Sequence, residues 1–353
     1  MVTTGPWLLY GANGYTGALV ARLAAERGHR PVLAGRRAGA VCELADTLGL
    51  ERRLFALDDA QRLDAALEGM TAVLHCAGPF SRTARPVAEA CLRTRTHYLD
   101  ITGEVEVFEA LAACDARARE RGVMLLPGCG FDVVPSDCLA VHLHGRLPSA
   151  VRLALAYASS GRLSRGTALT ALEGLGRPGL VRRGGVLTPV PPGQLRRRID
   201  LGEGPRLAIG IPLADLATAW RSTGIPDIEL YLAASLPLRA LALAGRWLGP
   251  ALGSPTVKGL LVRRVRAGQP GPSDDERARG RAFVWGEAKD AGGRRVEARL
   301  ETPDGYTFTA RAALAIVERV LAGDAKAGYA TPALAYGADF VLGIEGVRRF
   351  DVA

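Results

Sequence analysis

The first third of the chain alternates short apolar runs with stretches in which apolar residues recur every three or four positions. Short apolar runs bounded by Gly, Pro or charge are typical of buried strands, and the three-to-four spacing is typical of amphipathic helices. Two such helices are expected at 17–28 and 107–122. The alternation predicts a parallel sheet with crossover helices. Its six expected strands are 6–11, 30–35, 52–58, 72–78, 97–103 and 123–130.

The pattern changes from about residue 150, where longer strand-like runs follow one another. The first of these runs are 151–159, 206–213 and 227–235. The stretch 281–310 adds two hairpin signals, Ala291-Gly292-Gly293 and Asp304-Gly305, so we expect a mostly antiparallel sheet. Two segments, 182–198 and 266–280, are rich in Gly, Pro and charge and are expected to be loops.

These patterns predict an α/β protein with an N-terminal Rossmann-like, doubly wound parallel sheet and a second α+β domain with a mostly antiparallel sheet. The chain has 353 residues, 48% hydrophobic and 23% charged, which is enough for one large or two medium domains. We expect the first domain at 1–145 and the second domain at 146–330. We expect the C-terminal segment 331–353 to pack back on the first domain.

One stretch, 236–253, is apolar nearly all round except for Arg239 and Arg246. A membrane-spanning helix needs about 20 mostly apolar residues, and this stretch is shorter and is interrupted by Pro, Gly and Arg. Two interpretations stay open. The stretch is either a buried or homodimer-interface helix beside the substrate pocket, or a helix in peripheral contact with membrane lipid, with its arginines reaching the interface.

Charge and the cysteine and histidine content disfavour some classes of function. The formal charge of +9 comes mostly from arginine and reflects either an arginine-preferring genome or an anionic partner. Nucleic acid is not expected, because no recognition module accompanies the charge. The six cysteines show no metal-like spacing, His142 and His144 lack further ligands, and no secretory leader precedes the first strand. A reduced, cytoplasmic protein without a metal site is therefore expected.

The turn after the first expected strand carries the main chemical signal. Three glycines, Gly11, Gly14 and Gly17, lie between a strand and a helix, which is where a dinucleotide-binding fingerprint stands. The alternative is a packing turn, and the strand–helix alternation that follows favours the nucleotide. The expected cofactor-binding residues of this turn are Gly11, Asn13, Gly14, Tyr15, Thr16 and Gly17.

The end of the second expected strand indicates which nucleotide binds. An NAD site usually carries Asp or Glu there, about 20 residues beyond the glycines, to bind the ribose hydroxyls. This chain instead has Arg36 and Arg37 after Gly35. A guanidinium binds a phosphate through two parallel hydrogen bonds and stays charged, so NADPH is favoured over NADH. The alternative is that one or both arginines are solvated surface charges.

Small residues also end the fourth expected strand, in the run Cys76-Ala77-Gly78-Pro79. Ligands of open α/β sheets bind at the carboxyl ends of the strands, so we expect this run to pass close to the cofactor. The alternative is that Gly78 and Pro79 only form a turn and contact no ligand.

Five motifs stand in order along the first domain. They are YGANGYTG (10–17), AGR (34–36), CAGPF (76–80), YLDITGE (98–104) and PGCGFDVVPSD (127–137). Together they strongly resemble the saccharopine dehydrogenase-like oxidoreductases, especially the branch of trans-acting enoyl reductases. The resemblance continues more loosely at 164–167 and 328–333. It is specific for the family but not for the substrate.

The resemblance implies a nicotinamide-dependent oxidoreductase whose second sheet domain shapes the substrate pocket. In the enoyl reductase branch the substrate is a conjugated double bond of a polyketide or lipid intermediate, reduced in trans to a synthase. In the saccharopine branch it is an imine of an amino acid and a keto acid, whose carboxylates need convergent arginines. The apolar 236–253 favours the acyl substrate, and the arginines of 182–198 keep the imine open. A non-catalytic NADP-binding scaffold is a third hypothesis.

Polar groups at strand ends are the candidates for positioning the substrate or supplying a proton. We expect Tyr98 and Asp100 to lie near the nicotinamide, and Gly103 and Cys129 to line the cofactor site. The further candidates are Thr102, Glu104, Asp132, Ser136 and Asp137, several of which are as well explained by helix capping. A short-chain dehydrogenase is disfavoured, because none of the eight tyrosines has Lys four residues later.

Overall fold

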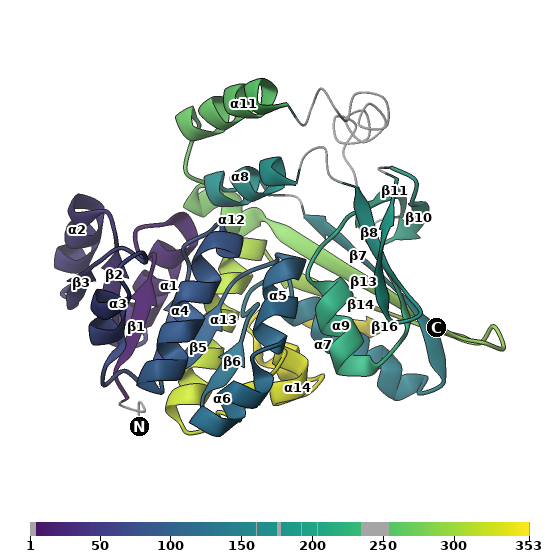
Figure 1. Ribbon diagram of the computed structural model, residues 1–353. Coiled ribbons are helices and arrows are strands. Elements are labelled where there is room, and N and C mark those ends of the chain that lie inside the picture. The colour runs from purple at the N-terminus through teal and green to yellow at the C-terminus, as the bar shows by residue number, and fades with distance from the viewer. Residues whose placement is uncertain are drawn as a thin grey trace. The chain divides into compact units, whose positions relative to one another are not determined.

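The computed structural model describes residues 5–159, 161–174, 178–191, 193–202, 204–233 and 254–352 (Figure 1). The chain forms two compact units. The first comprises Met1–Val134 and Tyr306–Tyr336, and the second comprises Pro135–Gly305 and Gly337–Ala353. These bounds differ from the expected ones, because a helix near 305–321 returns to the first unit and the chain from residue 337 onward returns to the second.

The first unit is built on a seven-stranded sheet in the order β15-β6-β5-β4-β1-β2-β3, and all of its pairings are parallel. Six of its strands lie within the six ranges expected from sequence, although they are shorter, so the Rossmann-like sheet is confirmed. The strands are β1 (Trp7–Tyr10), β2 (Val32–Gly35), β3 (Arg52–Leu54), β4 (Ala72–His75), β5 (His97–Asp100), β6 (Met124–Leu126) and β15 (Gly328–Tyr329).

Apolar residues cover both faces of this sheet. Leu8, Val73 and Tyr98 belong to a buried cluster that includes residues of the helices following β3, β4 and β5. Their neighbours along the strands, such as Leu9 and Leu74, point to the other face and are also fully buried. The helices are α1 (Tyr15–Glu26), α2 (Ala38–Leu48), α3 (Ala60–Leu67), α4 (Phe80–Thr94), α5 (Val105–Ala112), α6 (Asp115–Arg121), α13 (Gly305–Leu321) and α14 (Pro332–Tyr336).

The second unit contains a nine-stranded sheet whose main path runs β10-β11-β12-β7-β13-β14-β16, with β8 paired to β12 and to β9. Only β12 and β7 pair in parallel among its described strands, so the expected mostly antiparallel sheet is confirmed. Its strands are β7 (Ala150–Ser159), β8 (Gly179–Arg183), β9 (Val186–Val190), β10 (Arg196–Asp200), β11 (Pro205–Gly210), β12 (Asp227–Ala233), β13 (Arg281–Asp290), β14 (Arg295–Pro303) and β16 (Arg348–Asp351).

Helix α7 accounts for one shifted domain boundary. It packs against the second sheet so closely that a Cβ on Gly286 of β13 would lie 2.6 Å from Leu143. The helix therefore belongs with the second unit, although all of its residues except Arg146 fall within the expected first domain. The helices of this unit are α7 (Val134–Arg146, whose first residue is assigned to the first unit), α8 (Arg165–Glu173), α9 (Asp215–Thr223), α11 (Pro255–Ala267), α12 (Asp274–Arg279) and a 3-10 turn at Phe340–Gly343.

Several local expectations were wrong. The segment 182–198 is not a loop: Gly184 and Gly185, at φ +53° and +79°, form the turn of the β8–β9 hairpin, and β10 follows. A two-residue turn with both residues at positive φ is a common hairpin connection. The expected loop 266–280 contains α12, which begins with a Ser273–Glu276 capping box. The helix expected at 107–122 is divided into α5 and α6.

The two hairpin signals in 281–310 had different outcomes. The turn at Ala291-Gly292-Gly293 joins β13 and β14 as expected. Asp304-Gly305 instead begins α13, whose buried residues include Phe308, Ala312 and Ile316 at helical spacing. The apolar stretch 236–253 lies outside the described residues. Among those that are described, no helix is long and apolar enough to cross a membrane.

Candidate functional site

The glycine-rich turn joins β1 to α1 in a conformation that side chains would prevent. Gly11 has φ +82°, a left-handed conformation that favours glycine. A Cβ on Gly17 would lie 2.3 Å from the carbonyl oxygen of Gly11, so the helix packs on the turn itself. Gly14 precedes α1 and offers no side-chain cap to the first N–H groups of the helix. These N–H groups and the positive end of the helix dipole suit a phosphate.

The turn after β4 lies directly beside this glycine turn. A Cβ on Gly11 would meet the Ala77 nitrogen at 2.8 Å, so the two backbones touch. The run from Cys76 to Pro79 is partly exposed, and the Gly78–Pro79 peptide is cis. The structure therefore brings together the two loops that the sequence singled out separately.

Glu104 has a role that sequence analysis missed. It precedes α5, but its carboxylate accepts hydrogen bonds from the Phe80 and Ser81 nitrogens, both at 2.8 Å. Glu104, which lies in the connection between β5 and α5, thus caps the start of α4 and fixes the turn that contains Pro79. Spacing along the chain gave no signal for this contact, since it joins residues more than 20 positions apart.

Arg36 and Arg37 follow β2 and are exposed. Neither guanidinium group makes a hydrogen bond or an ion pair with any residue that the structure describes. Asn13 of the glycine turn reaches the same strand end, because its Oδ1 would lie 3.1 Å from a Cβ on Gly35. The end of β2 therefore carries two accessible guanidinium groups beside the glycine turn.

Helix α13 contributes residues that the sequence did not assign to this unit. The rings of Tyr15 and Tyr306 meet edge to face, with centroids 5.0 Å apart. The Phe131 nitrogen donates to the Thr309 hydroxyl at 2.9 Å, which ties the turn after β6 to α13. The helical spacing of apolar residues after Gly305 was the available signal, and the hairpin interpretation of Asp304-Gly305 obscured it.

Tyr98 and Asp100 form a buried hydrogen-bonded pair. The Tyr98 hydroxyl donates to Asp100 Oδ2 at 2.6 Å, and the nitrogens of Thr102 and Gly128 donate to Oδ1, both at 2.9 Å. Both side chains have no exposed surface. Burial raises the pKa of Asp100 to about 6, although these hydrogen bonds lower it, and burial raises the pKa of Tyr98 well above its usual value. Asp100 thereby joins the turns that follow β5 and β6.

Gly103 and Cys129 lie in those same two turns. A Cβ on Gly103 would meet Asp132 Oδ2 at 3.1 Å, and Gly103 is partly exposed. Cys129 is fully buried, and its thiol donates to the Leu126 carbonyl at 3.4 Å. Its backbone nitrogen donates to the Asp100 carbonyl at 2.6 Å. Cys129 therefore packs beneath the turn rather than on its surface.

Ser136 and Asp137 belong to a buried network of the second unit. Both are fully buried at the start of α7. Ser222 donates to Asp137 at 2.5 Å, and Tyr157 donates to Asp215 at 2.8 Å. Burial raises the pKa of Asp215 to about 7, while hydrogen bonds from Ser136 and Tyr157 lower it. These candidates tie α7 to α9 and β7, and they face no open surface.

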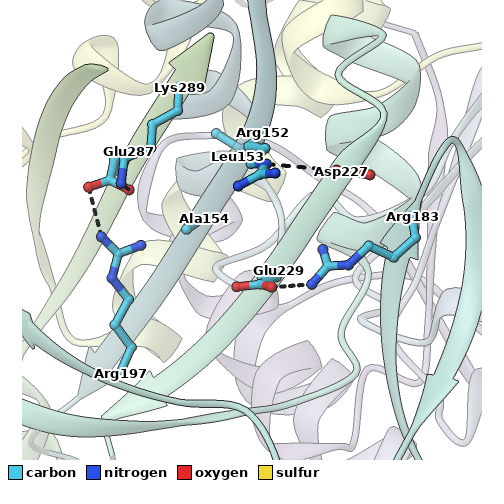
Figure 2. Close-up of a pocket in the computed structure, with 9 residues that line it drawn as sticks. All are labelled: Arg152, Leu153, Ala154, Arg183, Arg197, Asp227, Glu229, Glu287 and Lys289. Carbon is cyan, nitrogen blue, oxygen red and sulfur yellow. Dashed lines mark hydrogen bonds and ion pairs between the residues drawn. The ribbon is translucent and has the colours of Figure 1, made fainter. Parts of the chain in front are cut away.

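A charged cavity of about 490 Å³ lies on the second sheet, over Ala154 of β7 (Figure 2). Arg183 is ion-paired with Glu229, and Arg197 with Glu287 at 2.7 Å. The Arg197 guanidinium also stacks 4.8 Å from the Trp285 ring centroid. Figure 2 shows these two pairs on either side of Ala154.

Arg182, the other arginine at the end of β8, is buried, and its guanidinium donates to the Leu216 and Gly185 carbonyls. The arginines of 182–198 that line this cavity are therefore already paired with carboxylates.

The predicted cofactor residues cluster within the first unit at the carboxyl ends of β1, β2, β4, β5 and β6. The geometry leaves Gly14, Arg36 and Pro79 accessible and buries Tyr98, Asp100 and Cys129. Within the described ranges, no group of three or more His, Cys, Asp or Glu residues is placed to hold a metal ion.

Part of the chain resembles a known family of nucleotide-binding domains. Residues 7–126 match the family model of the saccharopine dehydrogenase NADP binding domain. The chain is 34% identical over 149 residues to a protein named trans-acting enoyl reductase from Mycobacterium ulcerans, and 34% identical over 148 residues to one of the same name from Mycobacterium leprae. Each match covers about 40% of this chain and 35% of the relative's length.

Two solved structures share the fold over nearly the whole chain. An apo saccharopine dehydrogenase (L-Glu forming) from Saccharomyces cerevisiae matches 99% of this chain and 100% of its own at a TM-score of 0.69, with 14% identity. A homospermidine synthase from Legionella pneumophila, in complex with NAD, matches 99% of this chain and 92% of its own at 0.65, with 9% identity. The α/β architecture with its two sheets is thus that of saccharopine dehydrogenase.

Proposed function

We propose that this chain, whose residues 7–126 are a saccharopine dehydrogenase-type NADP-binding domain, is an NADPH-dependent oxidoreductase. Its proposed reaction is hydride transfer to a conjugated carbon–carbon double bond of a polyketide, lipid or other specialised-metabolite intermediate. The substrate would be an acyl chain or a small molecule, presented by a synthase. The proteins named trans-acting enoyl reductase support this choice, although the chain matches only about a third of their length.

The observation that carries the proposal is the glycine turn. Its backbone lies where a Cβ on Gly17 would collide with Gly11, and the start of α1 is uncapped by any side chain. The residues present therefore fit a dinucleotide diphosphate at this turn. We assign cofactor contacts to Gly11, Asn13, Gly14, Tyr15, Thr16, Gly17, Cys76, Ala77, Gly78, Pro79 and Gly103, with Cys129 packed beneath them.

Arg36 and Arg37 would bind the 2′-phosphate that distinguishes NADPH from NADH. Both are exposed and make no ion pair within the described part of the chain, so their charge is available to a ligand. Arginine suits this task because its planar donors match phosphate oxygens.

NADPH, when bound, supplies the hydride. The chain's own residues then position the cofactor and the substrate and exclude water. We propose that Asp100 is a positioning residue, because it holds the turns after β5 and β6 through the Thr102 and Gly128 nitrogens. Tyr98 orients Asp100 through its hydroxyl. That Tyr98 or Asp100 takes part directly in the reaction remains a prediction.

The paired arginines of the charged cavity give the imine no support. An imine of an amino acid and a keto acid carries several carboxylates and needs arginines free to bind them. Arg183 and Arg197 are instead neutralised by Glu229 and Glu287. Imine reduction, its reverse, and a non-catalytic NADP-binding scaffold are the alternatives. A cytoplasmic location remains part of the proposal, in keeping with six cysteines that form no disulfide.

A substrate panel tests the proposal. NADPH oxidation would be followed by absorbance with α,β-unsaturated acyl thioesters, with simple ketones, and with an amino acid mixed with a keto acid. We expect oxidation with the unsaturated thioesters. Oxidation only with the amino acid and keto acid would establish the imine alternative. Retained NADPH binding without turnover of any substrate would establish the scaffold.

The cofactor assignment has its own test. Replacing Arg36 and Arg37 together with Ala should weaken NADPH binding on the order of 100-fold, since a hydrogen bond to a charged group contributes about 1.5–3 kcal/mol. NADH binding should change little. The double change Arg22→Ala and Arg121→Ala removes the same charge from exposed positions elsewhere on the first unit and is the control. Equal losses for both nucleotides in the Arg36 and Arg37 variant would contradict the assignment.

A further inference from the structure

Helix α11 has two different faces. It begins at Pro255 after the Ser254 cap, and it packs against α8. Val257, Leu261 and Val265 recur at helical spacing and are half-buried. None of the described side chains of α11 is fully buried, so the helix lies at the surface of the second unit.

The solvent-exposed side of α11 presents arginine and leucine. Arg263, Arg264 and Arg266 are exposed, and none of their guanidinium groups makes an ion pair or hydrogen bond with a residue that the structure describes. Leu260 shares this face and is 69% exposed. The helix sequence contains no carboxylate that would offset the charge. The result is a concentrated positive face with an apolar side chain within it.

The sequence around α11 continues the same composition. Residues 230–273 contain no Asp or Glu at all, whereas the whole chain holds 36 among 353 residues. The same range contains six cations, which are Arg239, Arg246, Lys258, Arg263, Arg264 and Arg266. An arginine-rich genome explains abundant arginine but not the absence of carboxylates over so long a range. The charge of +9 is therefore unevenly distributed along the chain.

We propose that the α11 face formed by Leu260, Arg263, Arg264 and Arg266 docks on an anionic lipid surface. Basic residues near such a surface are attracted to its lipid headgroups, and an exposed leucine among them can enter the boundary between headgroups and acyl chains. An acidic protein would satisfy the arginines but gives no reason for the exposed Leu260. The inference goes beyond the proposed reductase function and does not depend on it.

Vesicle flotation of the full chain tests the proposal. One set of vesicles contains phosphatidylglycerol mixed with phosphatidylcholine, and the other contains phosphatidylcholine alone. We expect the protein to float with the anionic vesicles at low salt, to float much less at high salt because surface charge is screened, and not to float with the neutral vesicles. Absence of flotation with the anionic vesicles at low salt would overturn the proposal and leave an acidic protein as the partner.

Variants separate α11 from the rest of the chain. The triple change R263Q, R264Q and R266Q should lower the partition coefficient on the order of 100-fold. The change L260Q should lower it by about ten-fold or less. The matched control R22Q, R121Q and R294Q removes the same charge from exposed arginines elsewhere. Similar losses in the two triple variants would show a nonspecific effect of net charge and overturn the assignment to α11.

NADPH affinity keeps this result distinct from the proposed function. All variants should bind NADPH like the wild type, because α11 and the nucleotide site belong to different units. Normal NADPH binding together with lost flotation places the defect at α11. Loss of both flotation and NADPH binding in the triple variant would indicate misfolding. In that case L260Q, if it binds NADPH like the wild type, tests the proposal: lower flotation than the wild type supports it, and unchanged flotation overturns it.

Discussion

Residue 17 has no room for a methyl group. A Cβ there would lie 2.3 Å from the Gly11 oxygen and 3.0 Å from the Ala12 Cα, and both are backbone atoms that are not free to rotate away. Gly17→Ala should therefore cost about 1–3 kcal/mol of stability and lower NADPH affinity about ten-fold or more, since 1.4 kcal/mol is a factor of ten. Denaturant unfolding and fluorescence titration measure the two effects.

Gly39 provides the matched control for this change. It lies in α2, and a Cβ there meets nothing within 4 Å. Gly39→Ala should leave NADPH affinity unchanged and stabilise the protein by up to about 1 kcal/mol, because alanine is the better helix former. Wild-type affinity in Gly17→Ala would contradict the close packing of α1 on its turn.

Asp100 accepts three hydrogen bonds where no water reaches it. Asp100→Ala should cost about 3 kcal/mol or more, since each buried donor left without an acceptor costs about 1–3 kcal/mol. Asp100→Asn keeps Oδ1 as an acceptor and should cost about 1 kcal/mol. Equal losses of stability in the two variants, measured by denaturant unfolding, would contradict the role of Oδ1 in holding the two turns.

Turnover in folded protein separates positioning from catalysis at these two residues. If Tyr98 and Asp100 only position the turns, Tyr98→Phe and Asp100→Asn should lower turnover modestly. Loss of turnover with retained NADPH affinity would instead establish a direct catalytic part. The sequence identified this pair from its place at a strand end, but it gave no sign that both side chains would be fully buried, because burial depends on α4, α5 and the strands on either side.

At the scale of elements, Glu104 joins two connections of the Rossmann-like sheet. Its carboxylate accepts from two N–H groups at the start of α4. Glu104→Ala should cost about 1–2 kcal/mol, as expected for loss of a helix cap with a favourable charge. Glu43→Ala, at an exposed position of α2, is the control and should change stability by less than about 0.5 kcal/mol. Thermal unfolding of the two variants checks the difference.

The strands of the first sheet were predictable because each is a short apolar run between turn signals. Elements later in the chain were harder to predict, because their turns and helix starts use the same residues as loops. Gly184-Gly185 is a hairpin turn inside a Gly- and Pro-rich segment, and Asp304-Gly305 begins a helix where a hairpin was expected. In both cases the local residues allow either structure, and pairing or packing with distant parts of the chain decides.

At the scale of the whole molecule, buried carboxyl groups make stability depend on pH. Burial raises the pKa of Asp215 to about 7, above its unfolded value of about 3.9. Between these values the folded state binds more protons than the unfolded state, so stability falls as pH rises from about 4 to about 7. This contribution has a slope of up to about 1.4 kcal/mol per pH unit.

Asp215→Asn removes the titrating group and should flatten that part of the curve. Urea unfolding of the variant and the wild type at several pH values measures the slope. A wild-type slope in the variant would show that Asp215 titrates alike in the folded and unfolded states. Sequence analysis placed Ser136 and Asp137 near the chemistry, and it missed Asp215 because this residue meets them only after α9 packs on α7.

The fate of a deuterium label tests the central claim most directly. NADPH carrying deuterium at both hydrogen positions of the nicotinamide C4 would be incubated with the protein and an α,β-unsaturated acyl thioester, and the product analysed by mass spectrometry. NADPH-dependent enoyl reduction predicts one deuterium on the carbon β to the thioester carbonyl and a solvent-derived proton on the α carbon. A saturated product without the label, or unreacted thioester beside tightly bound NADPH, would contradict it.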